Sequence, residues 1–400
     1  MSGAAWMIVQ AGGPTAVLNA SLASALAAAI ELPARGRIYG ACHGLKGLAA
    51  GRVVRLDELT AGQLRLMQVS PGAALGATRA KPGDKDFARI VDLLRALDVG
   101  RMLMMGGNGT MQCAAETAER CRAAGLDVQV IGVPKTADND LAGTDRCPGY
   151  ASAARYIAQS TRDLGQDLRA LPQPVTILET IGRSIGWPAA ASVLARERED
   201  DAPHIVCLPE IPFVLDRFLD DVDRVVTRQG WLVAVVTEGI RHADGSLVYE
   251  LPDVTQADPL LRPMTGGVGQ FLAGQVAQRL RIRCRSEKPG LLARSSAALA
   301  APQDRLDAAL VGKAGVQALV RGETGKMVSL TPLAERREPG WELVPFSQIS
   351  GVERRIPASW LTEGPLAVGE EFVNYLQPLV GELQPYLPAL EPAGLEAGVN

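Results

Sequence analysis

Short apolar runs alternate along this chain with segments of helical periodicity. The runs Ala5–Gln10, Arg101–Met105 and Val128–Val133 each lead into a loop rich in glycine or polar residues. The first run is followed by the alanine-rich segment Ala16–Glu31, which reads as a helix, and the second by a helical stretch that ends at Ala124. Fully apolar strands joined by helices are typical of parallel sheets that are covered by helices on both faces.

The same alternation continues in the second half of the chain. The pattern predicts a helix from about Tyr150 to Leu168 and buried strands at Val175–Glu179, Ile205–Leu208 and Leu232–Val236. From Thr331 onward the periodicity weakens and Pro, Glu and Trp become more frequent. We interpret this last part as edge strands, surface helices and a tail. The whole pattern predicts an α/β fold.

The composition is that of an ordinary globular protein. Of the 400 residues, 47% are apolar and 21% are charged, with 41 basic against 44 acidic residues and a net charge of −3. This balance gives no electrostatic basis for binding nucleic acid or a membrane surface. A chain of this length accommodates two or three domains of roughly 100–200 residues each.

Several further features favour a cytoplasmic protein. No apolar run approaches the roughly 20 residues of a membrane helix, and the N-terminus lacks a basic flank before an apolar core. The six cysteines are scattered without a C-x-x-C pair, which suits a reducing compartment. The three histidines are not spaced like metal ligands. We therefore expect a cytoplasmic protein with no nucleic-acid partner and no membrane partner.

Two glycine-rich loops lie between a predicted strand and a predicted helix. Gly12 and Gly13 follow the first strand, and Gly106, Gly107 and Gly109 follow the second. Glycine lets the backbone approach a phosphate closely, and the N-terminus of the following helix supplies amide donors and a positive dipole. The first loop lacks both the lysine of a Walker motif and the full G-x-G-x-x-G pattern, so by itself it fits a tight turn equally well.

A third loop carries the most informative side chains. After the strand Val128–Val133 the sequence reads Pro-Lys-Thr-Ala-Asp-Asn-Asp over residues 134–140. Asp138 and Asp140 fit the roles of base and Mg²⁺ ligand, and Lys135 fits the neutralisation of phosphate oxygens. A metal, a cation and a carboxylate that accepts a hydroxyl proton are the parts that phosphoryl transfer needs. The alternative is a capped loop with solvated Asp and Asn side chains.

Charged residues also mark three later segments. Glu179–Arg183 and Thr237–Gly239 each end a predicted strand, and Arg281–Arg294 is the densest basic stretch of the chain. Read alone, the basic stretch fits a solvated surface. Parallel sheets place their ligands at the carboxyl ends of strands, in crevices where the strand order reverses. The informative loops of this chain follow strands in that way.

Taken in order, these loops resemble those of the phosphofructokinases, over essentially the whole chain. The resemblance rests on Gly12-Gly13 with Asn19, the glycine loop with Thr110, residues 134–140, Gly182-Arg183 and the late arginines. Thr144–Ala154 is similar to the segment that follows the catalytic loop of that family. Gly266–Gln275 is similar to a stretch of the family's pyrophosphate-using branch.

The resemblance implies two Rossmann-like domains with mostly parallel sheets that face each other across an active-site cleft. A polar loop near residues 145–150 separates the two strand–helix series, and we place the domain boundary there. Residues 1–147, completed by about 294–345, would bind the phosphoryl donor. Residues 148–293, completed by about 346–400, would bind the sugar phosphate. The resemblance further implies a homodimer or a homotetramer.

The resemblance also assigns roles to single residues. Asp138 would be the base that accepts the proton of the sugar's 1-hydroxyl. Gly12 and Thr136 would contact the phosphoryl group during transfer, and Arg183 would stabilise its charge. The cofactor would be Mg²⁺, held by Asp140 and Asn108.

Two larger sets of residues would surround these groups. The implied donor site consists of Gly12, Gly13, Arg79, Gly107, Asn108, Gly109, Thr110 and Lys135. The implied sugar site consists of Thr136, Asp138, Ile181, Gly182, Arg183, Glu238, Arg285 and Arg294. In the sugar site, Glu238 would bind hydroxyls, and Arg285 and Arg294 would bind the 6-phosphate in bidentate fashion.

The phosphoryl donor stays open between pyrophosphate and ATP. Lys135 is similar to the pyrophosphate-using branch, in which an ammonium takes space that a nucleotide would need. That branch commonly carries Asp at the position of Gly109, where this chain has the glycine of ATP users. Because the whole chain resembles the pyrophosphate-using branch, we expect Mg²⁺-dependent transfer from pyrophosphate to the 1-hydroxyl of fructose 6-phosphate. The product would be fructose 1,6-bisphosphate, an intermediate of glycolysis.

Two departures from the family pattern concern the acceptor. Pro174 replaces an arginine or lysine that helps bind the sugar phosphate across the subunit interface, and Leu291 replaces a His or Tyr near the 6-phosphate. The loss of one such charge-assisted contact costs about 1.5–3 kcal/mol. The alternatives are therefore an ATP-dependent phosphofructokinase, a kinase of another sugar, and a non-catalytic regulatory subunit that binds a sugar phosphate.

Overall fold

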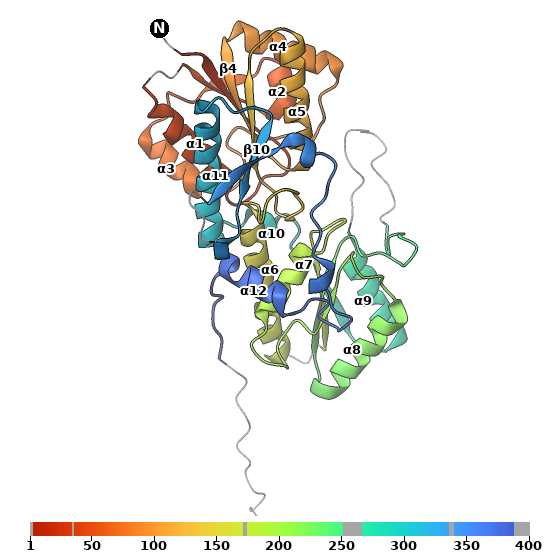
Figure 1. Ribbon diagram of the computed structural model, residues 1–400. Coiled ribbons are helices and arrows are strands. Elements are labelled where there is room, and N and C mark those ends of the chain that lie inside the picture. The colour runs from red at the N-terminus through yellow and green to blue at the C-terminus, as the bar shows by residue number, and fades with distance from the viewer. Residues whose placement is uncertain (1–2, 34–35, 171–173, 251–265, 336–339, 388–400) are drawn as a thin grey trace, which may run out of the picture.

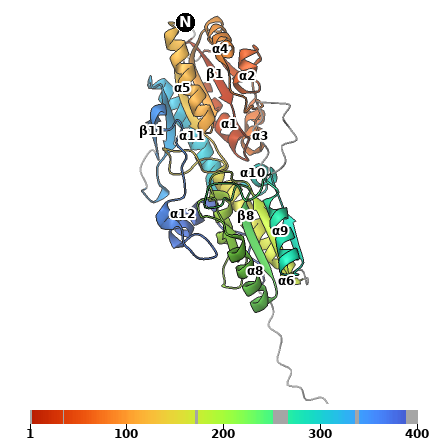
Figure 2. The ribbon, with the colours of Figure 1, turned by 90° about the vertical axis from the view of Figure 1, so that its right-hand side faces the viewer.

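The computed structural model describes residues 3–33, 36–170, 174–250, 266–335 and 340–387. Within these residues the chain forms two bodies, each built around its own sheet (Figure 1). The larger body, at the top of Figure 1, holds a seven-stranded sheet, and the smaller body below it holds a four-stranded sheet. In the turned view of Figure 2 the bodies lie one above the other, with α10 between them.

The larger sheet has the strand order β11-β10-β5-β4-β1-β2-β3. Its strands are β1 (Ala5–Gln10), β2 (Ile38–Ala41), β3 (Val53–Arg55), β4 (Val99–Gly106), β5 (Gln129–Pro134), β10 (Lys326–Leu330) and β11 (Trp341–Pro345). Neighbouring strands are parallel except in the pairs β2–β3 and β10–β11. The helices of this body are α1 (Leu18–Ile30), α2 (Gly44–Ala49), α3 (Ala61–Val69), α4 (Asp84–Ala96), α5 (Asn108–Ala123) and α11 (Pro302–Val320).

The smaller sheet has the order β7-β8-β6-β9, and its strands are all parallel. Its strands are β6 (Val175–Thr180), β7 (Ile205–Cys207), β8 (Leu232–Thr237) and β9 (Cys284–Glu287). The remaining α-helices are α6 (Tyr150–Ala170), α7 (Trp187–Ala190), α8 (Leu215–Gln229), α9 (Val268–Arg279), α10 (Leu292–Ser295) and α12 (Glu370–Val380). Four short 3₁₀ helices are η1 (Ala191–Ala195), η2 (Leu333–Glu335), η3 (Phe346–Gln348) and η4 (Ala358–Trp360).

Alternate residues of the central strands pack on opposite faces of the larger sheet. Met7 and Val9 of β1 lie in the core that α2, α4 and α5 cover, whereas Trp6 and Ile8 lie in the core that α1 and α11 cover. Strand β4 divides its side chains in the same way. Because both faces are buried, the stretches Trp6–Val9 of β1 and Met102–Met105 of β4 are apolar throughout, which explains the continuous runs in the sequence.

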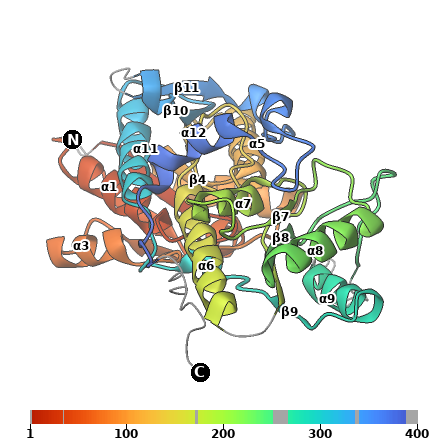
Figure 3. The same cartoon turned by 90° about the horizontal axis from the view of Figure 1, so that it is seen from below.

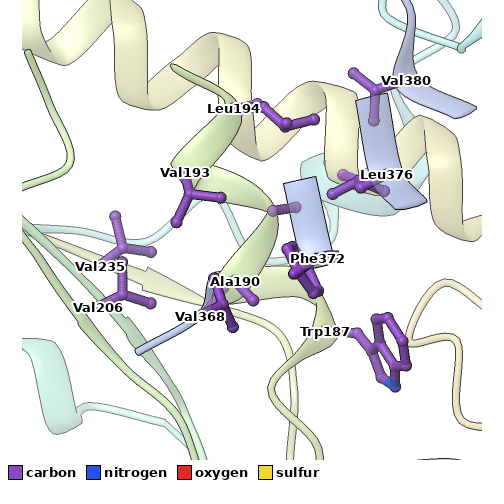
Figure 4. Close-up of a cluster of buried hydrophobic side chains, with 14 of the residues drawn as sticks. Trp187, Ala190, Val193, Leu194, Val206, Val235, Val368, Phe372, Leu376 and Val380 are labelled. Carbon is purple, nitrogen blue, oxygen red and sulfur yellow. The ribbon is translucent and has the colours of Figure 1, made fainter. Parts of the chain in front are cut away.

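The smaller sheet is also covered on both faces. Val206 and Val235 pack against α7, η1 and α12 in the core that Figure 4 shows, together with Trp187 and Phe372. The opposite face packs on α8 and α9, which lie together at one side of the smaller body and away from α12 (Figure 3). The C-terminal helix α12 therefore belongs to the core of the smaller body.

The predicted α/β class with mostly parallel sheets is confirmed. The six predicted strands are β1 and β4 to β8, and the predicted helices are α1, α5 and α6. The weakly periodic part after Thr331 holds the edge strand β11 and helix α12, while the predicted tail reaches residues 388–400, outside the described part of the chain. Among the described helices, none combines the length and apolarity that crossing a membrane requires.

A buried carboxylate fixes the N-terminus of α6 to α11. Asp304 of α11 accepts hydrogen bonds from the backbone N–H groups of Gly149 (2.8 Å) and Ser152 (3.0 Å), and from the Ser152 hydroxyl. One turn later, Asp307 accepts two hydrogen bonds from the Arg146 guanidinium, at 2.7 and 2.8 Å. Because α11 packs on the larger sheet and α6 on the smaller one, these contacts tie the two bodies together.

The substitution Asp304→Ala is expected to destabilise the protein by about 2–4 kcal/mol, because two buried N–H groups would lose their acceptor. Urea denaturation measures the change in the free energy of unfolding. The control Asp127→Ala, at an exposed position between α5 and β5, should change it by less than about 0.5 kcal/mol. Equal unfolding midpoints for the two variants would contradict this account of the junction.

Candidate active site

The loops after β1, β4 and β5 lie side by side at one edge of the larger sheet. Gln10 pairs with Met105, and Gly106 pairs with Pro134, so the three strands end at the same level. Strand β1 lies between β2 and β4, which is the point where the strand order reverses. Open α/β sheets bind ligands in the crevice at such a point. The sheet therefore gathers the three loops that the sequence analysis singled out.

A pocket of about 340 Å³ opens over the first of these loops. It is lined by Gly12, Gly13, Pro14, Ala73, Gly76, Ala77, Thr78, Arg79 and Arg294. Gly12 has a φ of +79°, and a Cβ on Gly13 would overlap Nη1 of Arg294 and approach Nη2 of Arg79 to 3.0 Å. Two guanidinium groups thus cover a backbone that has no room for a side chain. The result is a cationic pocket that suits an anion.

Lys135 reaches the same loop from the end of β5. Its Nζ donates a hydrogen bond to the carbonyl oxygen of Gly13 at 2.6 Å, and the side chain is buried. Burial lowers the pKa of Lys135 to about 8; Arg294 acts in the same direction, and the carboxylates of Asp140 and Asp138 oppose it. A buried ammonium whose acceptor is a neutral carbonyl favours an anionic ligand beside it.

Hydrogen bonds within the third loop fix its side chains. The Thr136 hydroxyl donates to Oδ1 of Asp140 at 2.7 Å and accepts from the backbone N–H of Asp138 at 3.1 Å. The backbone N–H of Thr136 donates to the carbonyl oxygen of Pro148 at 3.1 Å, which holds the loop at the start of α6. The two carboxylates of the loop therefore have different surroundings.

The environment of Asp138 favours a carboxyl group that can exchange a proton near neutral pH. Burial, together with the neighbouring charges of Asp140 and Glu238, raises the pKa of Asp138 to about 7. Arg294 and Lys135 act against this shift. A general base works best when its pKa lies near the working pH. Asp138 therefore has the electrostatics of a general base.

Asn108 and Asp140 form the part of the site that fits a metal ion. Nδ2 of Asn108 donates to the backbone oxygen of Asp140 at 3.1 Å and to its Oδ2 at 3.3 Å. Oδ1 of Asn108 is buried and has no hydrogen-bond partner within the described residues. Mg²⁺ takes oxygen ligands of this kind and commonly shares its coordination with substrate phosphates. In the described part of the chain no three His, Cys, Asp or Glu residues form a metal site.

The smaller sheet faces this cluster with the loops after β6 and β8. A Cβ on Gly239 would overlap the backbone of Arg183, so the two loops are in close contact. The backbone N–H of Glu238 donates to the carbonyl oxygen of Thr180 at 3.0 Å. Because the charge of Glu238 acts on Asp138, these groups of the two bodies lie close to each other.

Most of the predicted site residues lie on the loops that follow strands of the two sheets. On the side of the larger sheet are Gly12, Gly13, Arg79, Gly107, Asn108, Gly109, Thr110, Lys135, Thr136, Asp138 and Asp140, and the second body adds Ile181, Gly182, Arg183 and Glu238. Arg294, predicted to bind the sugar 6-phosphate, lies against Gly13 and Arg79.

Arg285 does not join this cluster. It is exposed on the edge strand β9 and pairs with Thr176, four residues before the end of β6. At about 3.3 Å per residue, this position lies about 13 Å along the strand from the loop that carries Arg183. Pro174 lies at the same end of the sheet, where its carbonyl oxygen accepts a hydrogen bond from Leu232 at 2.6 Å.

Sequence reasoning missed the segment from Ala73 to Thr78, which completes the cationic pocket. The carbonyl oxygen of Thr78 accepts a hydrogen bond from the backbone N–H of Gly12 at 3.0 Å, so this segment holds the first glycine loop in place. The available signal was Gly72 and Gly76 shortly before Arg79. That signal lacks the strand and helix that frame the other loops.

Comparison with known proteins identifies the family of this chain. A model of the phosphofructokinase family matches residues 5–319. The chain belongs to the phosphofructokinase family. As a member of this family it is a phosphotransferase enzyme.

Relatives of this phosphofructokinase align over nearly its whole length. A pyrophosphate--fructose 6-phosphate 1-phosphotransferase of Xanthomonas campestris pv. campestris is 36% identical over 388 residues, which cover 94% of this chain and 91% of the relative. A sulfofructose kinase of Alkalicoccus urumqiensis is 31% identical over 370 residues, with 88% and 93% covered. The structure of a pyrophosphate-dependent phosphofructokinase from Nitrosospira multiformis superposes with a TM-score of 0.85 at 29% identity, covering 96% and 94% of the two chains.

The lowered pKa of Lys135 predicts how activity depends on pH. The ammonium predominates below pH 8 and is lost above it, so kcat/KM for an anionic donor should fall about tenfold per unit once the pH exceeds about 8. Steady-state kinetics between pH 6.5 and 9.5 measure this limb. In Lys135→Met the limb should be absent and kcat/KM low throughout. Because ionisation of the donor itself affects both enzymes equally, parallel profiles for the two would contradict the assignment.

Proposed function

We propose that this phosphofructokinase transfers a phosphoryl group from pyrophosphate to the 1-hydroxyl of fructose 6-phosphate, with Mg²⁺ as cofactor. The observation that carries the proposal is the convergence of Lys135, Arg79 and Arg294 on the first glycine loop, beside the carboxyl group of Asp138. Lys135 and Arg79 suit the phosphates of the donor, Arg294 suits the 6-phosphate of the sugar, and the carboxyl group beside them suits the acceptor hydroxyl. The pyrophosphate-using relatives named above support the choice of donor.

In the proposed reaction the sugar oxygen attacks the terminal phosphorus of the donor while the bond to the leaving phosphate breaks. Asp138 takes the proton of the attacking hydroxyl. The Gly12 backbone and the Thr136 hydroxyl lie at the edge of the sheet where the phosphoryl group would pass. Arg183, in contact with the Glu238 loop, would face that group from the smaller sheet. Positioning and charge neutralisation account for the catalysis, without covalent chemistry by the protein.

Asp140 and Asn108 would hold the Mg²⁺ ion. Bound there, Mg²⁺ neutralises phosphate oxygens of the donor. The Thr136 hydroxyl and the Asn108 amide keep the Asp140 carboxylate oriented, and Oδ1 of Asn108 gains the partner that it lacks.

The donor proposal depends on two positions with opposite effects. Gly109 is exposed at the start of α5, and a Cβ placed there meets nothing within 4 Å, so this position leaves room for a nucleotide. Lys135 fills space beside Gly13 and adds a charge that a compact anion uses fully. We give the lysine the greater weight because it is buried and held in place, whereas the glycine only leaves space.

We further propose that the body of the larger sheet binds the donor and that the body of the smaller sheet binds the sugar. In this division residues 1–147 act with about 294–345, and residues 148–293 act with about 346–400. Arg285 reaches a sugar phosphate only if a second copy of the chain brings its cleft to strand β9. The remote position of Arg285 thus supports a homodimer or homotetramer.

A second candidate is the same reaction with another sugar as acceptor. Leu291 precedes α10 and is 66% exposed, so the chain has no hydrogen-bonding side chain there beside Arg294. A sulfonate carries one negative charge fewer than a phosphate dianion and needs fewer such contacts. The sulfofructose kinase among the relatives makes a sulfofructose the first alternative to test.

The alternative function that is not enzymatic is a regulatory subunit, which binds a sugar phosphate without turnover. Such a subunit would have a site that has lost its catalytic groups. The hydrogen bonds among Thr136, Asp138 and Asp140 and the raised pKa of Asp138 argue against such a loss. Calorimetric titration distinguishes the two classes. Binding of sugar phosphate without turnover by any donor would favour the regulatory subunit.

The substitution Asp138→Asn tests the proposed base. It should lower kcat by about 100- to 10,000-fold, because the amide cannot accept the proton. Its KM values and thermal unfolding should stay close to those of the parent enzyme. Asp220→Asn, exposed on α8, removes the same charge as a control and should change kcat by less than about twofold. If Asp138→Asn kept kcat within threefold of the parent value, Asp138 would not be the base.

A further inference from the structure

A short segment between η3 and η4 connects two loops of the site. One is the loop of residues 134–140 in the larger body, and the other is the loop after β6 in the smaller body, which carries Arg183. This segment consists of Glu353 and Arg354, and we call it the strap. Glu353 forms an antiparallel bridge with Leu141, and the backbone N–H of Arg354 donates to the carbonyl oxygen of Asp140 at 2.9 Å. The strap is therefore hydrogen-bonded to the end of the loop that carries Asp138.

The other side of the strap contacts the smaller body. The hydroxyl of Ser184, directly after Arg183, donates to Oε1 of Glu353 at 3.1 Å. Nε1 of Trp187 donates to the carbonyl oxygen of Arg354 at 3.2 Å, and the Arg354 guanidinium lies 4.4 Å from the centre of the Trp187 ring system. Trp187 is fully buried in the core of the smaller body (Figure 4). Its position therefore anchors the strap.

Tyr375 of α12 supports the catalytic loop from beneath. Its hydroxyl donates to the carbonyl oxygen of Asp145 at 2.8 Å and accepts from Nδ2 of Asn139 at 3.2 Å. Asn139, which lies between Asp138 and Asp140 in the sequence, is buried and has a φ of +56°, in the left-handed region. A non-glycine residue in this region keeps its conformation only when its surroundings fix it. The Tyr375 hydroxyl supplies one such contact.

Arg354 and Tyr375 also pack against each other. The Arg354 guanidinium lies 5.5 Å from the centre of the Tyr375 ring, and so it contacts two aromatic rings at once. Nη1 of Arg354 is buried and has no hydrogen-bond partner within the described residues. Within the described residues this side chain lies against its two aromatic neighbours and 3.5 Å from the Tyr375 hydroxyl, and its charge also acts on the carboxyl group of Asp145.

We propose that Arg354 and Tyr375 are positioning residues that hold the Asp138 loop at a fixed separation from the Arg183 loop. Neither would touch a substrate. The proposal rests on the proposed function for the roles of Asp138 and Arg183, whereas the connection between the two loops stands on the contacts alone. A displacement of about 1 Å between reacting groups costs roughly 100-fold in rate, so a loosened strap should lower kcat. In the division proposed above each substrate binds mainly to one body, so its KM should change little.

Kinetics of four variants test this role. Arg354→Met keeps the length and loses the cation, Tyr375→Phe loses only the hydroxyl, and Arg355→Met removes the same charge at the exposed neighbouring position. The first two should lower kcat by about 10- to 100-fold with less than threefold change in either KM. Arg355→Met should stay within twofold of the parent enzyme in both. Arg354→Lys, which keeps a cation against Trp187, should recover part of the lost kcat.

Hydrogen exchange measured by mass spectrometry separates this proposal from the proposed function, because it needs no turnover. In Arg354→Met, peptides that cover residues 136–141 and 181–187 should both exchange faster, while peptides of β1 and β4 stay unchanged. A parent enzyme inactive with every donor would refute the proposed function and leave this test intact. Unchanged exchange in both loops, or faster exchange throughout the molecule, would overturn the positioning role. So would equal kcat values for Arg354→Met and Arg355→Met.

Discussion

The site depends on one electrostatic constraint, which is the burial of the Lys135 ammonium against the carbonyl oxygen of Gly13. A buried cation is costly unless an anion accompanies it. Arg79 and Arg294 add positive charge at the same glycine, and burial together with their mutual repulsion lowers the pKa of Arg294. In the proposed function, the phosphate groups of the substrates would supply the missing charge. The glycines of the first loop are necessary because side chains there would displace these cations.

A second electrostatic feature of the site is the repulsion among its carboxylates. Asp138, Asp140 and Glu238 lie close enough for their charges to raise the pKa of Asp138, and they come from two bodies with separate cores. Their mutual repulsion would separate the loops if nothing held them. The junction of α6 with α11 fixes the bodies near the base of the cleft, and the strap connects the loops themselves. Both connections come from parts of the chain distant in sequence from the loops that they hold.

Strands with a continuous apolar run and loops with a distinctive group of glycines or charged residues could be predicted from the sequence. Features that depend on contacts between distant parts of the chain could not. Strands β1 and β4 to β8 are mostly buried, so their apolar runs are nearly continuous. The three loops at the ends of β1, β4 and β5 could be grouped because parallel strands end at one edge. The place of Arg294 beside Gly13, the remote place of Arg285 and the contacts of Arg354 depend on packing between the bodies, which leaves no spacing in the sequence.

The most direct test of this account is the choice of phosphoryl donor by the unmodified enzyme. A coupled assay for fructose 1,6-bisphosphate, with Mg²⁺ and fructose 6-phosphate, gives kcat/KM for pyrophosphate and for ATP under the same conditions. The buried Lys135 ammonium predicts turnover with pyrophosphate and a value for ATP at least about 100-fold lower, equivalent to about 2.7 kcal/mol of discrimination. Equal or faster turnover with ATP would show that the space at Gly109 decides the donor. Such a result would contradict the role given to Lys135.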